Sequence, residues 1–260
     1  MASRLRASRI LVAVPILFLA GCAGGLPPQP ATPQRPSFSS DTGTVARNTF
    51  EVEVGLAVDD QDGLDTPVAA KWGATEATEL FLGFSPYLRV DGGADDPSGA
   101  GDLVAGGRVR FLEEKGGRPS AAIQFAAKLP SADEAEGLGT GEVDAFGAGI
   151  LTKTIDLTTL VGYYQLGVLG EPAATGVDLE HGLAVAVAHP LAGDLGGFVE
   201  VAGVFTPDQD SEAVFTTIGL GYSASASIVL DAAVAIGLSN DAGDFSATIG
   251  ATANLGSIPR

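Results

Sequence analysis

The feature that most constrains this chain is an alternation of apolar with small or polar residues, with a period of two. Val52, Val54 and Leu56 share one parity of the segment 50–59, whereas Glu51 and Glu53 share the other. Successive side chains of a strand point to opposite faces, so the pattern predicts strands with one apolar face. The predicted strands are 50–59, 68–74, 80–89, 103–111, 123–129, 142–152, 160–169, 179–188, 197–205, 213–222, 226–236 and 245–255.

The connectors between these segments alternate in length and charge. Connectors such as 91–102 and 130–142 are long and acidic, whereas 76–79 and 153–158 are short. Long loops outside and short turns inside, with an even number of strands of roughly ten residues, are typical of bacterial outer-membrane barrels. We therefore expect an all-β fold over 49–260, an antiparallel up-and-down transmembrane β-barrel of about 12 strands. Its first strand would start on the periplasmic side.

The alternative is a soluble β-sandwich or lipocalin-like barrel with its apolar face inward. In that fold the alternate residues of each strand that face water would be rich in Lys and Glu. Here the second parity is mostly Gly, Ala, Ser and Thr, and the chain holds only 14 Lys and Arg in 260 residues. A surface so poor in lysine would guard badly against edge-to-edge pairing, whereas a lumen tolerates it. The composition therefore favours the membrane barrel.

The N-terminus is typical of an exported lipoprotein. Arg4, Arg6 and Arg9 precede a short apolar stretch, which is too short to span a bilayer and so indicates a signal peptide over 1–21. Residues 19–22 read Leu-Ala-Gly-Cys and resemble the bacterial lipobox, which implies cleavage before Cys22 and attachment of lipid to its thiol. An ordinary secretory signal is the alternative. Cys22 is the only cysteine, so no disulfide can form within one molecule.

Residues 22–48 are rich in Pro, Ser, Thr and Gly, which predicts a semi-extended linker between the lipid anchor and the barrel domain 49–260. The net charge of −18 disfavours nucleic acid as a partner. The expected partners are outer-membrane lipid and a small-molecule solute. The expected location is the outer membrane of a Gram-negative cell envelope, and the oligomeric state stays open.

Two stretches resemble a family of outer-membrane transporters named for the meta-pathway of phenol degradation. One is Gly101-Asp102-Leu103, which leads into 107–111 with its basic residues. The other is 125–130, ending in Lys-Leu-Pro, followed by the glycine-rich return 137–141 and Asp144. The resemblance covers about residues 48 to 255. It implies an antiparallel barrel and the passage of small molecules, aromatic or apolar ones among them.

No pattern in the chain indicates an enzyme, a cofactor or a metal site. His181 and His189 are the only histidines, and the G-x-S-x-G elbow that an embedded hydrolase could use is absent. The acidic stretches 59–62 and 91–96 lack the spacing of a calcium loop. Solvated acidic loops are the simpler interpretation.

The charged residues of the small-residue parity are the candidate functional residues. They would line a pore and either create a field across it, as charged rings do in channels, or pair as salt bridges that brace the wall. Both interpretations stay open. The candidates are Lys71, Arg89, Arg108, Arg110, Lys128, Glu51, Glu53 and Asp231. The function expected from the sequence is a passive channel or transporter, and the alternative is a β-rich lipoprotein that binds a ligand or partner without transport.

The lipobox generates the first testable prediction. Replacing Cys22 by Ser should abolish incorporation of labelled palmitate, because the thiol that carries the lipid is lost. Metabolic labelling followed by gel fluorography measures this. Unchanged labelling in the variant, or a mature N-terminus other than residue 22, would contradict lipidation at Cys22.

Overall fold

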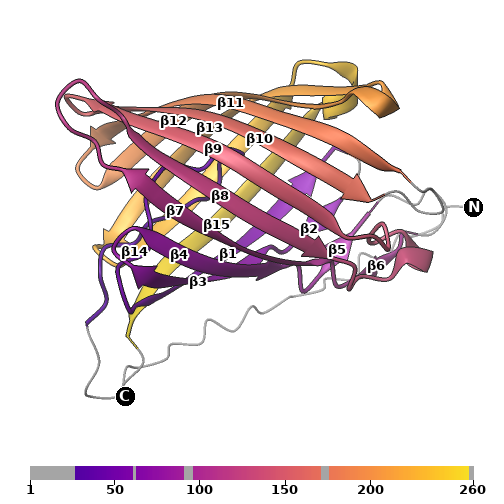
Figure 1. The fold of residues 1–260 in the computed structure, drawn as a ribbon, viewed down its shortest axis with the longest axis horizontal. Helices are drawn as coiled ribbons and strands as arrows, with labels where there is room; N and C mark the ends of the chain where they lie inside the picture. The colour runs from indigo at the N-terminus through magenta and orange to yellow at the C-terminus, as the bar shows by residue number, and fades with distance from the viewer. Residues whose placement is uncertain (1–26, 61–62, 91–95, 171–175, 258–260) are drawn as a thin grey trace, which may run out of the picture.

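The computed structural model describes residues 27–60, 63–90, 96–170 and 176–257. The predicted signal peptide and Cys22 lie outside the described residues. Twelve long strands of the described chain form one antiparallel sheet in sequence order, and the last strand pairs with the first, which closes the barrel (Figure 1). The wall strands are β1 (Phe50–Asp59), β3 (Val68–Thr75), β4 (Thr78–Phe84), β7 (Leu103–Leu112), β8 (Ser120–Leu129), β9 (Asp144–Ile155), β10 (Thr158–Gly170), β11 (Val177–Ala192), β12 (Leu195–Thr206), β13 (Ser211–Ser225), β14 (Ile228–Gly237) and β15 (Phe245–Gly256).

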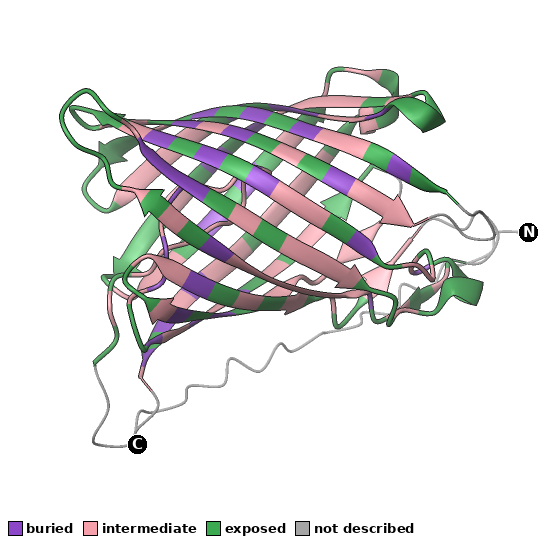
Figure 2. Cartoon of the chain, viewed as in Figure 1, coloured by how far each residue is buried: buried purple, intermediate pink, exposed green. Residues whose placement is uncertain are grey.

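The period-two pattern explains which side chains face outward. Buried and exposed residues alternate along the strands (Figure 2). Val54 and Leu56 of β1 are exposed on the outer face, and so are Phe111 and Phe125 of β7 and β8, each more than 60% accessible. A barrel surface of such residues suits lipid, and the closed ladder leaves no unpaired strand edge there. The expected fold class and strand number are confirmed.

The two ends of the barrel differ as the connectors predict. At one end, two-residue turns join β3 to β4, β9 to β10, β11 to β12 and β13 to β14. Asp156 and Gly193 adopt positive φ in two of these turns, which suits tight hairpins. At the other end the connectors are longer and hold the short strands β2 (Leu64–Asp65), β5 (Leu88–Arg89) and β6 (Ser98–Gly99). The single-turn helices η1 (Glu134–Glu136), η2 (Pro207–Gln209) and η3 (Asn240–Ala242) also lie at this end (Figure 1).

One predicted strand is wrong in its extent. The alternation continues from residue 80 to 89, but β4 leaves the wall after Phe84, and Arg89 lies on β5, which pairs with β2 and β6 at the long-loop end. Ser85, Pro86 and Tyr87 form the break, because a proline cannot donate to a strand ladder. Arg89 therefore does not share the wall with Lys71 and Arg108.

The segment 27–48 is the main departure from the sequence analysis. It forms no helix or wall strand, in keeping with its composition, but it is not a free spacer. Near its start, Ala31 N donates to Ala226 O in a short turn (2.9 Å), and near its end, Thr44 Oγ1 donates to Glu76 O in another (3.2 Å). Between these points the backbone N–H of Phe38 donates a hydrogen bond to the carboxylate of Glu200, on the inner face of β12. The segment thus enters the barrel at the short-turn end, turns inside it and returns to begin β1 (Figure 1).

The orientation of the barrel can be tested by cysteine labelling of intact cells. In a Cys22→Ser background, a cysteine replacing Asp208 of η2 should react with a reagent that cannot cross the outer membrane. A cysteine replacing Lys115, in the connector at the short-turn end, should react only after lysis, because long loops face outward. Reaction at position 115 alone in intact cells would contradict this orientation.

Candidate functional site

The lumen has a charged side, on which Lys71, Arg108 and Lys128 each lie next to an acid. Lys71 of β3 lies directly across from Glu51 of β1, and its Nζ is 2.6 Å from Glu51 and 2.8 Å from Glu53. All three side chains are buried. The acids therefore stand beside the base on the neighbouring strand and not across the lumen. Opposite charges at facing positions are a standard stabilising cross-strand pair.

The same arrangement recurs on the next strands. Arg108 of β7 faces Glu79 of β4, which the sequence analysis did not single out, and the two charged groups are 3.7 Å apart. Lys128 of β8 faces Asp144 of β9 at 2.6 Å and also lies 3.6 Å from Asp102. Pairing within the wall therefore describes this side of the lumen better than a continuous arc of unpaired cations.

Arg108 and Arg110 also hold the returning limb of the segment. Arg108 donates to Gly43 O at 2.9 Å and to the side chain of Gln124 at 2.7 Å. Arg110 donates to Thr42 O at 3.3 Å. Guanidinium groups have five donors in a planar fork, so one arginine can bond a wall residue and a backbone carbonyl at once.

Glutamates of the wall accept hydrogen bonds from the backbone of the segment. Glu51 accepts from Thr32 N at 2.9 Å, and Glu53 accepts from Gln34 N at 2.7 Å. Glu79 accepts from Val45 N at 2.9 Å. Glu200 accepts from Phe38 N at 2.8 Å and from Ser39 N at 2.9 Å. A buried carboxylate needs such donors, and bonds to a charged acceptor are about twice as strong as neutral ones.

Asp231 meets the tip of the segment. Its carboxylate is 3.4 Å from the guanidinium of Arg35, which also donates to Thr248 Oγ1 at 2.8 Å. Gly55 and Gly250 face each other across the β1–β15 seam, and the guanidinium occupies the space that a side chain at either glycine would fill. The seam that closes the barrel is therefore also the place where the segment tip is held.

The opposite side of the lumen is apolar. Its buried residues come from β8 to β12, and most are alanines. Phe38 of the segment and Phe215 of β13 pack against them. The full cluster is Ala122, Ala148, Ile150, Val161, Tyr163, Ala184, Ala186 and Ala202. The parity of these residues was visible in the sequence, but nothing in it indicated that Phe38 would pack on them.

The segment lines at least two cavities. One of about 220 Å³ is lined by Phe38, Phe215 and Thr217, together with residues of β14 and β15. The other, of about 280 Å³, is lined by Arg35, Glu53 and Asp102 among others. One lies on the apolar side of the segment tip and the other on the charged side.

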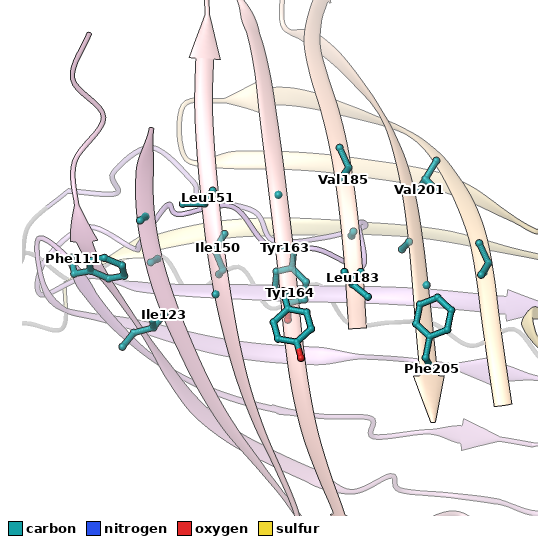
Figure 3. Close-up of a pocket in the computed structure, with 18 residues that line it drawn as sticks. Phe111, Ile123, Ile150, Leu151, Tyr163, Tyr164, Leu183, Val185, Val201 and Phe205 are labelled. Carbon is teal, nitrogen blue, oxygen red and sulfur yellow. The ribbon is translucent and has the colours of Figure 1, made fainter. Parts of the chain in front are cut away.

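The outer face carries a separate hollow of about 720 Å³ over β7 to β13 (Figure 3). Outward-facing Gly149 and Gly162 have open space where a side chain would project, and Phe111, Leu151 and Tyr164 rise around them. Inner-face residues of the same strands, among them Ile150 and Tyr163, also line this hollow. They do so because Gly149 and Gly162 have no side chain to cover the backbone on the outer face.

The two histidines belong to the outer face. His181 Nδ1 is 3.0 Å from the hydroxyl of Tyr164, and His189 Nδ1 is 3.0 Å from Thr158 Oγ1. Among the described residues, no group of His, Cys, Asp and Glu could hold a metal ion. In the same part of the chain, no helix is long and apolar enough to cross a membrane.

Comparisons with known proteins agree on the fold. Residues 34–255 match the model of the family described as "Putative MetA-pathway of phenol degradation". An outer membrane channel of the COG4313 group from Pseudomonas putida F1 superposes with a TM-score of 0.63 at 12% identity, covering 84% of this chain and 100% of that one. The NanC porin gives 0.56 and the KdgM porin 0.52, each at 10% identity over 78% of this chain and 98% of the porin. A search of curated protein sequences found no match.

Gly73 offers a test of how firmly the segment is held. The segment backbone lies directly on this glycine, and a Cβ there would collide with the carbonyl oxygens of Val45 and Ala46. Gly73→Ala should therefore destabilise the barrel by about 1–3 kcal/mol, the usual range for overpacking. The midpoint of heat-induced mobility change on gels measures this.

Gly83→Ala is the matched control. Gly83 also faces the lumen, but its added Cβ would make only ordinary contacts, the nearest at 3.5 Å. It should unfold at the wild-type temperature. Equal midpoints for wild type and both variants would show that the segment is not packed against Gly73.

Proposed function

Because the chain belongs to the MetA-pathway phenol-degradation family, we propose that it is a passive channel for small molecules in an outer membrane. One observation carries the proposal. Twelve strands close into a barrel whose outer face is apolar and whose inner face is charged on one side and alanine-rich on the other. An outward apolar band around a lined lumen is the arrangement of membrane channels.

In this proposal the segment 27–48 sets the size of the pore. It enters the lumen from the short-turn end and is bonded to the wall from Thr32 to Val45. The spaces left beside its tip, of about 220 and 280 Å³, suit small solutes and not bulky ones. Apolar or aromatic solutes fit the alanine side.

The lipid anchor belongs to the same proposal. Ala31 bonds to the β13–β14 turn at the short-turn end, and Cys22 precedes it by nine residues in the sequence. A lipid on Cys22 would then enter the periplasmic leaflet of the outer membrane beside the barrel. It would also fix the start of the segment at the membrane, whereas the end of the segment is fixed by the peptide chain that continues into β1.

The alternative is a β-rich lipoprotein that binds a ligand or partner and conducts nothing. The observation in its favour is the number of bonds that hold the segment, since a permanently filled lumen would not conduct. Conductance of the full-length protein in planar bilayers separates the two. A folded protein without any channel events, in wild type and in the variant below, would support the alternative.

The double substitution Arg108→Ser and Arg110→Ser tests the role of the segment. It removes the donors to Gly43 O and Thr42 O, so the returning limb should loosen and the conductance should rise. The loss of two cations should also shift the reversal potential toward cation selectivity. The shift should be larger at low salt, because the Debye length grows from about 8 Å at physiological ionic strength to about 30 Å at 0.01 M.

Arg89→Ser is the control for this experiment, because it removes a cation from the long-loop end and not from the wall. It should leave the conductance close to that of wild type. A double variant that is folded and conducts with unchanged conductance and reversal potential would exclude both a clamping and a selectivity role for Arg108 and Arg110.

A further inference from the structure

The cavity of about 280 Å³ on the charged side of the lumen has a floor of small side chains. Ala69 of β3, Gly83 of β4 and Val104 of β7 line it and lie directly across from one another on neighbouring strands. Glu53 of β1 lies across from Ala69 and continues the row. Neighbouring strands lie about 4.8 Å apart, so the row from Glu53 to Val104 spans roughly 14 Å. The cavity therefore has a carboxylate at one end of a floor made of small residues.

The floor is open above Gly83. A Cβ added there would meet only the carbonyl oxygen of Val68 at 3.5 Å and Ala69 Cβ at 3.9 Å. Both atoms belong to the neighbouring wall strand, and no atom of the described part of the segment stands within 4 Å. At Gly73, by contrast, the backbone of the segment fills the corresponding space. The segment thus leaves room for a solute at Gly83.

Glu53 presents an unused oxygen to this room. Its side chain is only 7% exposed, and it lines the cavity. Oε1 accepts from Gln34 N at 2.7 Å and from Lys71 Nζ at 2.8 Å. Oε2 accepts no hydrogen bond from the part of the chain that the structure describes. A carboxylate removed from water is costly unless its oxygens are bonded, so a donor that enters the cavity finds a charged acceptor.

The guanidinium of Arg35 lines the same cavity and has donors to spare. The hydrogen bonds that it donates to described residues go to Asp231, Thr248 Oγ1 and Ile249 O, and all of them use Nη2. Its Nε is buried and has no partner among the same residues. A guanidinium carries five donors, so this one can bond an entering acceptor without releasing the wall.

Arg35 and Glu53 face one cavity without pairing with each other. Across the described ranges, the ion pair of Arg35 is with Asp231, and that of Glu53 is with Lys71. A solute that carries both a carboxylate and an ammonium group would satisfy the two sides at once. Hydrogen bonds between charged partners are about twice as strong as neutral ones. The ligand chemistry that fits is therefore a small zwitterion.

The charges around the cavity disfavour a simple anion. Acids outnumber bases there, so a negative charge entering alone would be repelled, whereas an ammonium group offsets the excess. The bases are Arg35, Lys71 and Lys128, and the acids are Glu51, Glu53, Asp102, Asp144 and Asp231.

We propose that this cavity binds a small α-amino acid with an apolar side chain. The carboxylate of the amino acid accepts from Arg35, its ammonium group donates to Glu53 Oε2, and its side chain lies over Gly83. The inference rests on the proposed channel function for its purpose. Ser85, which follows β4, and Asp102, which precedes β7, bring the cavity to the long-loop end, where a solute would enter. The binding itself does not require conduction.

The test is isothermal titration of the full-length protein in detergent with L-valine, isobutylamine and isovalerate. The two analogues keep the hydrocarbon part of valine, but isobutylamine lacks the carboxylate and isovalerate lacks the ammonium group. L-valine should bind at least about tenfold more tightly than either analogue, because each analogue loses one hydrogen bond between charged partners.

Two substitutions separate the roles of the charged groups. Arg35→Gln should remove the preference for L-valine over isobutylamine and leave the binding of isobutylamine in place. Glu53→Gln should remove the preference for L-valine over isovalerate, because a neutral acceptor is weaker than a charged one. Heat-modifiable mobility on gels identifies the variants that remain folded.

Gly83→Val fills the cavity and leaves both charged groups in place. It should weaken the binding of L-valine at least about tenfold, because the side chain takes the space of the ligand. Gly221→Val is the matched control. Gly221 has the inward parity of buried Thr217 on β13, its added Cβ would meet only Val229 at 3.8 Å, and it does not line the cavity. It should bind L-valine as wild type does.

The outcomes separate the site from the channel. A folded wild-type protein that conducts but binds L-valine no more tightly than the two analogues overturns the site and leaves the channel standing. Binding of L-valine that is lost in Gly83→Val, without conductance in any variant, supports the site and overturns the channel. Equal losses in Gly83→Val and Gly221→Val would show a general disturbance of the lumen and would also overturn the site.

Discussion

The closure of β15 onto β1 is the constraint on which the rest of the structure depends. In lipid, no water satisfies a free backbone N–H or C=O, so a sheet can cross a membrane only if its two edges pair. The pairing runs from Phe50↔Gly256 to Asp59↔Ser246. It brings Gly55 and Gly250 together, and their missing side chains leave the space that Arg35 fills. Closure thus creates the outer apolar surface, the enclosed lumen and the attachment of the segment tip.

The enclosed lumen then changes the energetics of every charged residue inside it. Carboxylates such as Glu51, Glu79 and Glu200 are removed from water by the segment, and each would be costly without donors. The backbone N–H groups of the segment supply those donors, and the same bonds satisfy a stretch of chain that forms no secondary structure of its own. The wall and the segment therefore stabilise each other. The segment can leave such a lumen only if water or a solute replaces the hydrogen bonds between the wall carboxylates and the backbone N–H groups of the segment.

Much of the fold could be predicted from the sequence because β-barrels repeat one local rule. Val52, Val54 and Leu56 alternate with polar residues, and this alternation shows that they share one face of their strand, wherever the strand lies in the barrel. The same alternation predicted that Lys71 and Asp231 point inward. The rule failed at Arg89, where the alternation persists across Pro86 although the wall strand ends at Phe84. It was also silent on Glu79, whose importance comes from the partner Arg108 on a strand far along the chain. Register decides such pairs, and a single strand carries little information about register.

By itself, the sequence determined the class of fold, the strand number, the inward or outward direction of most side chains and the difference between the two ends, because all of these follow from local periodicity and connector length. Only the tertiary structure decided where residues 27–48 lie. Their Pro, Ser, Thr and Gly composition fits a solvated linker and a lumen-filling strand of chain equally well, since both leave the backbone without internal hydrogen bonds. The difference lies in the partners, and Glu200 meets Phe38 across 162 residues of sequence. Such a contact exists only after the barrel has closed around the segment.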